Sequence, residues 1–193
     1  RIIGNQSPRY RYGVNLSARW NGIGLSVFLQ GVGARDWYPG SDAGMFWGKY
    51  GRPFFALIPS IHNYTDDMYS AERNNWDTAY WPRMTTYQSN GTKNWTRLLE
   101  IPNTRYIQSA AYLRVKNIQL DYSFPKHICS AIRLQGLKIY VNAENLFTFT
   151  PLHKYAPNFD PEGLSYDSDF ASAADGYTYP ILKSVTVGVN ITF

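Results

Sequence analysis

Hydrophobic and polar residues alternate one by one along five separate segments of this chain. Successive side chains of a β-strand point to opposite faces, so this alternation predicts strands with one apolar face and one polar face. Each segment has about ten residues or more, which is the length that a tilted strand needs to cross a membrane. The predicted strands cover residues 9–20, 24–35, 112–124, 137–149 and 180–193.

The last predicted strand is regular up to the final residue. Apolar residues occupy every second position from Val185 to Phe193, where the chain ends on an aromatic side chain. Chain ends are commonly frayed and polar, so this regularity indicates that the end itself has a function. We expect the Phe193 ring to face the membrane and to act as the assembly signal of a closing barrel strand.

Three local features refine the predicted strands. The apolar phase of 112–124 switches after Val115, which predicts a β-bulge near Lys116 and Asn117. Asn145 interrupts the apolar face of 137–149. Between the first two strands lies Asn21-Gly22, a dipeptide typical of a two-residue hairpin turn.

The connections between the strands alternate between short and long. The tight turn and residues 125–136, where 126–132 is predicted to form a helical turn, are short; residues 36–111 and 150–179 are long. Outer-membrane barrels have this asymmetry, with short periplasmic turns and long extracellular loops. The predicted fold class is therefore all-β, with antiparallel transmembrane β-barrel strands, and it places the end of the chain in the periplasm. Five strands cannot close a barrel, so we expect a larger parent barrel.

Composition excludes several other classes of protein. The formal net charge is +5, but basic residues are scattered singly, which favours a solvated surface over a nucleic-acid site. The single cysteine, Cys129, excludes an intramolecular disulfide. No apolar run reaches the roughly 18–20 residues that a membrane-spanning helix needs.

The sequence contains no recognisable catalytic or cofactor motif. The three histidines lie far apart, no serine occupies a GxSxG motif and no glycine-rich phosphate loop is present, so we expect neither an enzyme nor a cofactor. Acidic residues in 150–179 could bind calcium, but their spacing matches no EF-hand, and a solvated acidic loop is favoured. The weak calcium candidates are Asp160, Glu162, Asp167 and Asp169.

Several segments resemble one family when they are read in order. These segments are NLSARW (15–20), LSVFLQGVGARDWY (25–38), YLRVKNIQLDYSFP (112–125) and IYVNAENLFTFT (139–150), followed by Tyr179-Pro180 before the terminal strand. They resemble the late barrel of the SusC/RagA-like TonB-dependent transporters of the Bacteroidetes outer membrane. The resemblance covers nearly the whole of residues 1–193 and is specific in combination.

The resemblance implies a function and a set of partners. It implies that the chain supplies the last five strands of a 22-stranded barrel whose upstream part includes an N-terminal plug. It also implies import of glycans, as in polysaccharide utilisation, or of peptides, energised by the TonB complex and assisted by a SusD-like surface lipoprotein. Neither a plug nor a TonB box occurs in these 193 residues.

Candidate contact residues lie in the long predicted loop and on the polar strand faces. Aromatic loop side chains could stack on sugars or peptides, but a loop of this length also needs its own packing, and 65–74 is predicted as a short helix capped by Thr65. Loop packing together with lipoprotein docking is favoured over direct substrate contact. The loop candidates are Trp37, Tyr38, Trp47, Trp76, Tyr80, Trp81, Tyr87 and Trp95. The residues expected to face the lumen or the plug are Arg11, Asn15, Lys138, Asn142 and Glu144.

One alternative from a different class stays open at this point. A secreted β-sandwich carbohydrate-binding module would also combine alternating strands with aromatic loops. Such a sandwich buries its apolar faces against each other, whereas membrane strands expose them to lipid. The exposure of the apolar faces therefore discriminates between the two interpretations.

Overall fold

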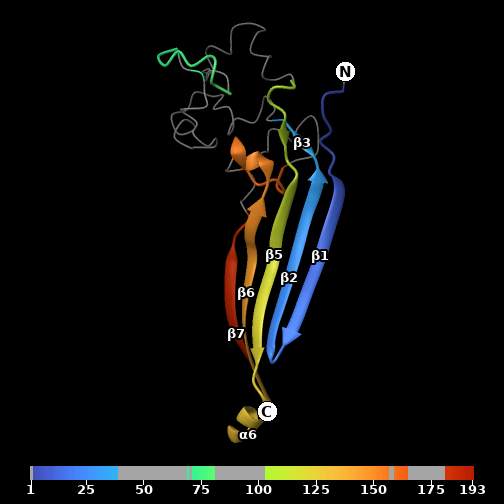
Figure 1. Cartoon of the computed structure of the whole chain (residues 1–193), viewed down its shortest axis with the longest axis vertical. Helices are drawn as coiled ribbons and strands as arrows, with labels where there is room; N and C mark the ends of the chain where they lie inside the picture. The colour runs from blue at the N-terminus through green and yellow to red at the C-terminus, as the bar shows by residue number, and fades with distance from the viewer. Residues whose placement is uncertain (1, 39–68, 70, 81–102, 157–158, 165–180) are drawn as a thin grey trace. The chain divides into compact units, whose positions relative to one another are not determined.

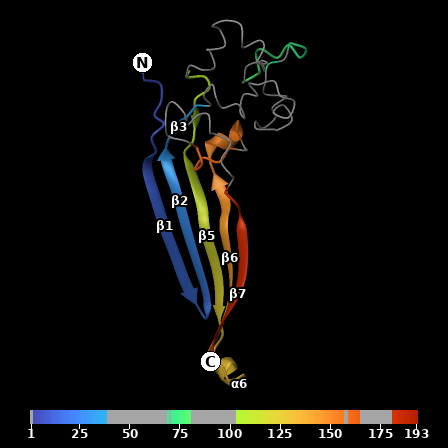
Figure 2. The same ribbon diagram turned by 180° about the vertical axis from the view of Figure 1, so that it is seen from behind.

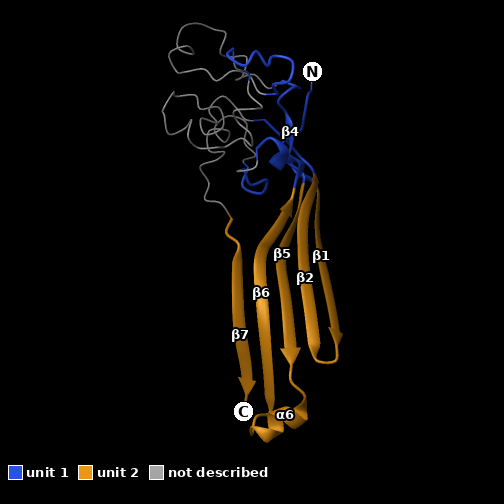
Figure 3. Ribbon diagram, turned by 60° about the vertical axis from the view of Figure 1, so that its left-hand side comes forward, with its two compact units in different colours: residues 1–9, 34–111, 150–180 blue, residues 10–33, 112–149, 181–193 orange. Residues whose placement is uncertain are grey.

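The computed structural model describes residues 2–38, 69, 71–80, 103–156, 159–164 and 181–193. The chain divides into two compact units (Figure 3). The first, here called the loop unit, comprises residues 1–9, 34–111 and 150–180. The second, here called the sheet unit, comprises residues 10–33, 112–149 and 181–193.

The long strands form one five-stranded sheet in the order β1-β2-β5-β6-β7 (Figure 1 and Figure 2). Their bounds are Arg9–Trp20, Ile23–Ala34, Tyr112–Ser123, Gly136–Phe149 and Ser184–Thr192. The pairs β2–β5, β5–β6 and β6–β7 are antiparallel. All five predicted strands are thus present, and the first four begin and end within one residue of the predicted positions. The fifth prediction was too long, because residues 181–183 precede the strand without joining its ladder.

Strand register places the apolar side chains on one common face of the sheet. One row across four strands consists of Leu25, Leu120, Val141 and Val187. All four side chains are exposed, and Val187 has 72 % of its surface accessible. The residues between them in sequence carry mostly polar side chains to the opposite face. An apolar face that is open rather than buried is what the alternation predicts for a membrane strand.

Two irregularities keep the apolar face in phase. Val115 is opposite Phe147 whereas Asn117 is opposite Glu144, so Lys116 has no single partner on β6. The β-bulge predicted near Lys116 and Asn117 is confirmed. On the partner strand, Asn145 adopts a positive φ of 52° and its Nδ2 donates to the carbonyl oxygen of Leu182 at 3.1 Å. Asparagine tolerates this backbone conformation, which explains the interruption of the apolar pattern.

Two connections lie at the same end of the sheet. Asn21 and Gly22 have φ values of 46° and 85°, as a type I′ hairpin turn requires, so the predicted tight turn is confirmed. The predicted helical turn is the helix α6, Lys126–Ala131, between β5 and β6. No helix among the described residues is long and apolar enough to span a membrane.

The loop unit contains a small sheet and a hydrophobic core. Strand β3 (Asp36–Trp37) pairs with β4 (Gln108–Ser109), and the 3-10 helix η1 covers Pro151–Lys154. The buried core consists of Trp37, Ala110, Leu152, Ala156, Phe159 and Leu164. The predicted helix 65–74 is not supported where it can be checked, since residues 71–74 form a turn; residues 65–68 and 70 lie outside the described part.

Candidate functional site

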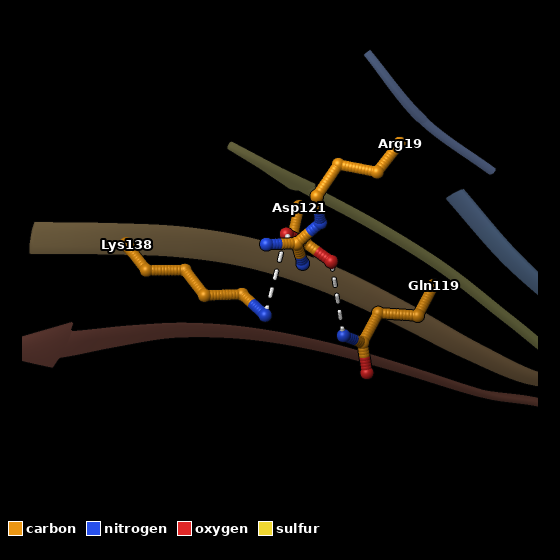
Figure 4. A network of polar contacts seen from close by, with 4 residues as sticks. All are labelled: Arg19, Gln119, Asp121 and Lys138. Carbon is orange, nitrogen blue, oxygen red and sulfur yellow. Dashed lines mark hydrogen bonds and ion pairs between the residues drawn. The ribbon is translucent and has the colours of Figure 1, made fainter. Parts of the chain in front are cut away.

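The most concentrated charge on the polar face of the sheet surrounds Asp121 of β5 (Figure 4). One carboxylate oxygen lies 3.3 Å from Arg19 Nη2 and 3.3 Å from Lys138 Nζ, and the other accepts a bond from Gln119 Nε2 at 3.5 Å. Only 4 % of the Asp121 side chain is exposed. These contacts join β1, β5 and β6, so we call Arg19, Gln119, Asp121 and Lys138 the Asp121 network.

A glycine makes room for the Asp121 network. Gly24 of β2 is opposite Asp121, and a Cβ atom at this position would lie 2.7 Å from Asp121 Oδ1. Without a side chain there, the carboxylate can reach across β2 to Arg19 on β1. The network has two cations and one carboxylate, and most of the Arg19 side chain is exposed, so an excess of positive charge remains on this face.

The predicted lumen-facing residues occupy different environments. Lys138 belongs to the Asp121 network, and Glu144 Oε2 accepts a bond from Ser184 Oγ at 3.1 Å. Asn142 is half-buried, and its Oδ1 has no hydrogen-bond partner among the described residues. Arg11 and Asn15 are exposed on β1. That these side chains face a lumen or a plug stays a prediction.

In the loop unit, the predicted contact residues Trp37 and Tyr38 are buried. Trp37 is 2 % exposed, and its ring centroid lies 5.2 Å from that of Phe159. Tyr38 Oη accepts a bond from Asn103 Nδ2 at 3.1 Å, and burial raises the pKa of Tyr38 to about 12. These environments favour the packing alternative for both residues.

Tyr80 is also held by its neighbours in the loop unit. Its ring stacks on Tyr155 with centroids 4.0 Å apart, and its hydroxyl donates to the Arg105 carbonyl oxygen at 2.6 Å. The same hydroxyl accepts a bond from Gln108 Nε2 at 2.7 Å. Burial, the largest cause, raises the pKa of Tyr80 above its ordinary value. The structure therefore gives Tyr80 a packing environment within the loop unit.

Trp76 differs from the other described aromatic candidates because 72 % of its surface is exposed. It follows the turn at residues 71–74. The remaining loop candidates, Trp47, Trp81, Tyr87 and Trp95, lie outside the described residues. Trp76 is thus the described candidate whose ring is available to a ligand or to a partner protein.

The predicted calcium candidates are described only in part. The backbone N–H of Glu162 donates to Asp160 Oδ1 at 2.9 Å, which is a local turn contact. Asp167 and Asp169 lie outside the described residues. Within the described ranges, no three His, Cys, Asp or Glu side chains gather as possible metal ligands. At the chain end, Phe193 follows β7 and is exposed.

Sequence reasoning missed several residues that organise these regions. Arg35 is buried in the loop unit and donates to the carbonyl oxygens of Gln6, Pro161 and Leu164 at 3.2, 3.0 and 2.8 Å. Asp121 lies on the polar face of its predicted strand, and this position was the only feature of the sequence that could have pointed to it. Its partners are distant in sequence, so only the strand register identifies them.

Several known proteins are similar to this chain. No family model matches the chain. TonB-dependent receptor P3 of Formosa agariphila is 25% identical over 199 residues, which cover 100% of this chain and 17% of the relative. TonB-dependent receptor P39 of the same species is 23% identical, with the same two coverages. The chain thus spans about one sixth of the length of these curated relatives.

Solved structures show the same fold. The RagAB peptide importer in its open-open state matches with a TM-score of 0.57 and 19% identity, covering 100% of this chain and 18% of that one. In its closed-closed state the TM-score is 0.58 and the identity 18%, with the same coverages. The resemblance inferred from the sequence motifs is confirmed: along its whole length, this chain is similar to a barrel segment of SusC/RagA-like TonB-dependent receptors.

Proposed function

We propose that this chain forms five adjoining wall strands, at the C-terminal end of the barrel, in an outer-membrane TonB-dependent importer of oligomeric nutrients. The observation that carries the proposal is the exposed apolar face, which runs across β2, β5, β6 and β7 in register. Hydrocarbon is the environment in which such a face is stable, because water contact with this much apolar surface is unfavourable.

The polar face of the sheet supports the same proposal. It carries the Asp121 network and the exposed side chains of Arg11, Asn15 and Glu144. Opposite faces of one sheet therefore suit two different media, as in a barrel wall between lipid and an aqueous interior. The remaining strands of a 22-stranded barrel, the plug and the contact with TonB would come from the upstream part of the parent receptor.

The alternation of connections gives the proposed orientation. The Asn21-Gly22 turn and α6 lie at one end of the sheet, which we assign to the periplasm. Residues of the loop unit would then be extracellular, where a SusD-like lipoprotein and the nutrient bind. Trp76 is the described aromatic residue proposed for such a contact, because its ring is exposed.

The substrate class is proposed as peptides or glycans. The solved structures that share the fold are named as a peptide importer, and the sequence relatives are named as receptors without a substrate. Aromatic rings and polar groups serve both classes of ligand. The β-sandwich alternative is not supported, since no second sheet covers the apolar face within the described residues of the sheet unit.

Membrane fractionation of cells that produce the full-length receptor tests the proposal. We expect the receptor in the outer-membrane fraction, soluble only with detergent, and with a folded form that migrates faster than the heat-denatured form in gel electrophoresis. A receptor that stays soluble without detergent would contradict the proposal. Uptake of labelled peptides and labelled oligosaccharides by the same cells would then decide between the two substrate classes.

The proposed contact at Trp76 has its own test. Trp76→Ala should reduce nutrient uptake or lipoprotein binding while leaving the amount of folded receptor unchanged, because its ring is exposed. Trp76→Phe keeps a flat ring and serves as the matched control. If uptake and lipoprotein binding both persist in Trp76→Ala, the proposed contact is wrong although the import function can stand.

A further inference from the structure

The helix α6 has an unusual surface for a connection between two strands. Ile128 lies in α6 and Ile132 is the C-cap residue that follows it; they are 40 % and 53 % exposed. Four residues apart is the spacing of neighbouring side chains on a helix surface. Both views of the chain show α6 beyond the ends of β5 and β6 (Figure 1 and Figure 3). Two branched apolar side chains are thus presented outside the sheet.

A buried cysteine fixes the orientation of this helix. Cys129 is 1 % exposed, and its Sγ lies 3.7 Å from the carbonyl oxygen of Phe124. The Gln135 N–H donates to the Thr192 carbonyl oxygen at 2.8 Å, which ties the far end of the connection to β7. Cys129 therefore points inward, and the exposed Ile128 and Ile132 lie on the flank of the helix beside it.

The charged side chains of the connection between β5 and β6 have one sign. No acidic residue occurs between Asp121 and Glu144, whereas Lys126 and Arg133 flank the isoleucines. Both basic residues are exposed. An apolar pair bordered by cations is complementary to an anionic lipid surface, where acyl chains lie beneath negative headgroups.

The apolar face of the sheet continues toward this helix. The Tyr122 and Phe124 rings make an edge contact with centroids 4.9 Å apart, and the Phe124 N–H donates to the Leu137 carbonyl oxygen at 2.9 Å. Leu137 is opposite Ile191 on the apolar face. The surface proposed to meet lipid therefore extends as far as Phe124, which directly precedes the connection that contains α6.

We propose that α6 binds the anionic phospholipids of the periplasmic leaflet, with Ile128 and Ile132 inserted among the acyl chains and Lys126 and Arg133 at the headgroups. This inference rests on the proposed function, which sets α6 at the periplasmic end of a membrane barrel. According to this inference, the connection between β5 and β6 anchors the barrel to lipid and is more than a simple turn.

Photocrosslinking of the full-length receptor tests the inference. The receptor is reconstituted in vesicles of equal parts phosphatidylglycerol and phosphatidylcholine, with p-benzoylphenylalanine in place of Ile128. A second variant carries it at Val187 on the apolar sheet face, and a third at Ser130, which lies on nearly the opposite side of the helix from Ile128. We expect lipid adducts at 128 and 187 and several-fold fewer at 130.

The pattern of adducts separates the two proposals. Lipid adducts at 187 together with protein adducts alone, or no adducts, at 128 would overturn the lipid anchor and leave the barrel proposal standing. No lipid adducts at 187 would overturn both. Equal adducts at 128 and 130 would also contradict the anchor, because only the isoleucine side of the helix is proposed to enter the membrane.

Charge variants test the preference for anionic lipid. In the photocrosslinking receptor, Lys126→Gln with Arg133→Gln should lower the ratio of phosphatidylglycerol to phosphatidylcholine adducts, by roughly fivefold for each charge removed. The matched variant, Lys126→Arg with Arg133→Lys, should retain the ratio. An unchanged ratio in the uncharged variant would overturn the headgroup role of the two cations.

Discussion

The loop unit and the sheet unit place the same kinds of residue in opposite environments. The buried core residues Trp37, Leu152 and Phe159 all belong to the loop unit. In the sheet unit, Leu25, Leu120 and Val187 are exposed. A protein domain in water buries its apolar surface, whereas the sheet unit exposes an apolar face, as expected for a sheet in contact with hydrocarbon. The difference is the physical signature of a chain that meets both water and hydrocarbon.

The largest expected effect concerns the core of the loop unit. Trp37→Ala should destabilise this unit by about 3–5 kcal/mol, because it removes a large ring that packs on Phe159 and leaves a cavity. Hydrogen exchange at amides around Leu152 in the full-length receptor measures the loss. The matched control is Trp76→Ala, which should change stability by less than about 0.5 kcal/mol because the ring is exposed. Equal losses of stability in Trp37→Ala and Trp76→Ala would contradict the contrast between a buried and an exposed ring.

The next effect concerns the apolar face of the sheet. Val185, near the start of β7, lies opposite Ala143, which lies opposite Ile118, close to the middle of β6 and β5. Val185→Arg should cost about 2–4 kcal/mol in a bilayer, where a charge near the midplane is poorly solvated. Urea unfolding of the receptor in lipid vesicles measures the cost, with Thr186→Arg on the polar face as the control. A loss under about 0.5 kcal/mol at Val185, typical of a water-exposed site, would show that this face does not meet lipid.

The loop unit should respond to alkaline pH through Tyr38. Its pKa is about 12, above the ordinary value of 10.0, mainly because burial disfavours the charged phenolate. The unfolded chain therefore loses this proton at lower pH than the folded chain does. The stabilisation is fully present below pH 10 and is lost as pH rises from about 10 to 12, by about 2–3 kcal/mol.

Unfolding of the receptor's loop unit as a function of pH checks the Tyr38 prediction. Tyr38→Phe should remove a large part of the fall in stability between pH 10 and 12, although Tyr80 and Tyr106 also have raised pKa values. A tyrosinate absorbance titration of the same variant should lack its most alkaline component. An identical pH profile in both proteins would show that Tyr38 ionises as freely as an exposed tyrosine.

In the sheet unit, the comparable polar interaction is the Asp121 network. Asp121→Asn should destabilise the receptor by about 1–2 kcal/mol, since it removes the charge that offsets Lys138 and Arg19. The loss stays modest because both cations remain partly exposed to water. Urea unfolding at low and high salt measures it, and Arg19→Gln is the smaller control. A stability that is unchanged at either salt concentration would show that the network does not join the strands energetically.

Much of the sheet could be predicted because each strand face contacts its own medium. Alternation located the strands, the Asn21-Gly22 dipeptide located the hairpin, and the phase switch at Lys116 located the bulge. All three signals are local in sequence. The start of β7 was predicted less well, because the Leu182 carbonyl oxygen bonds to the Asn145 side chain instead of joining the ladder, which the alternation of side chains does not report.

The candidate site could be predicted only in part, because its contacts join residues far apart in sequence. Trp37 and Trp76 look alike in a sequence, yet one is buried against Phe159 and the other is exposed. Burial of Trp37 depends on a segment more than a hundred residues away. The Asp121 network likewise depends on a strand register that the bulge shifts.

The smallest expected effect tests whether the Asp121 network needs an empty position on β2. Gly24→Ala would place a Cβ atom 2.7 Å from Asp121 Oδ1, so the carboxylate must turn away from its partners. We expect a loss of about 1 kcal/mol, at the low end for overpacking because the side chain can move. At Gly136, in the same sheet, the nearest atom to an added Cβ is Thr192 Oγ1 at 3.6 Å, so Gly136→Ala should be nearly neutral.

A double-mutant cycle completes the Gly24 test by separating a steric effect on the network from a general intolerance of alanine in the strand. If Gly24→Ala acts by displacing the carboxylate, it should cost little in a receptor that already carries Asp121→Ala, which removes the side chain that the added Cβ atom would meet. Additive losses from the two substitutions, measured by urea unfolding, would show that Gly24 matters to the strand itself. A coupling free energy close to the full loss caused by Gly24→Ala would show that the two residues act together. Gly24 would then be required because it leaves room for the buried carboxylate that joins β1, β5 and β6.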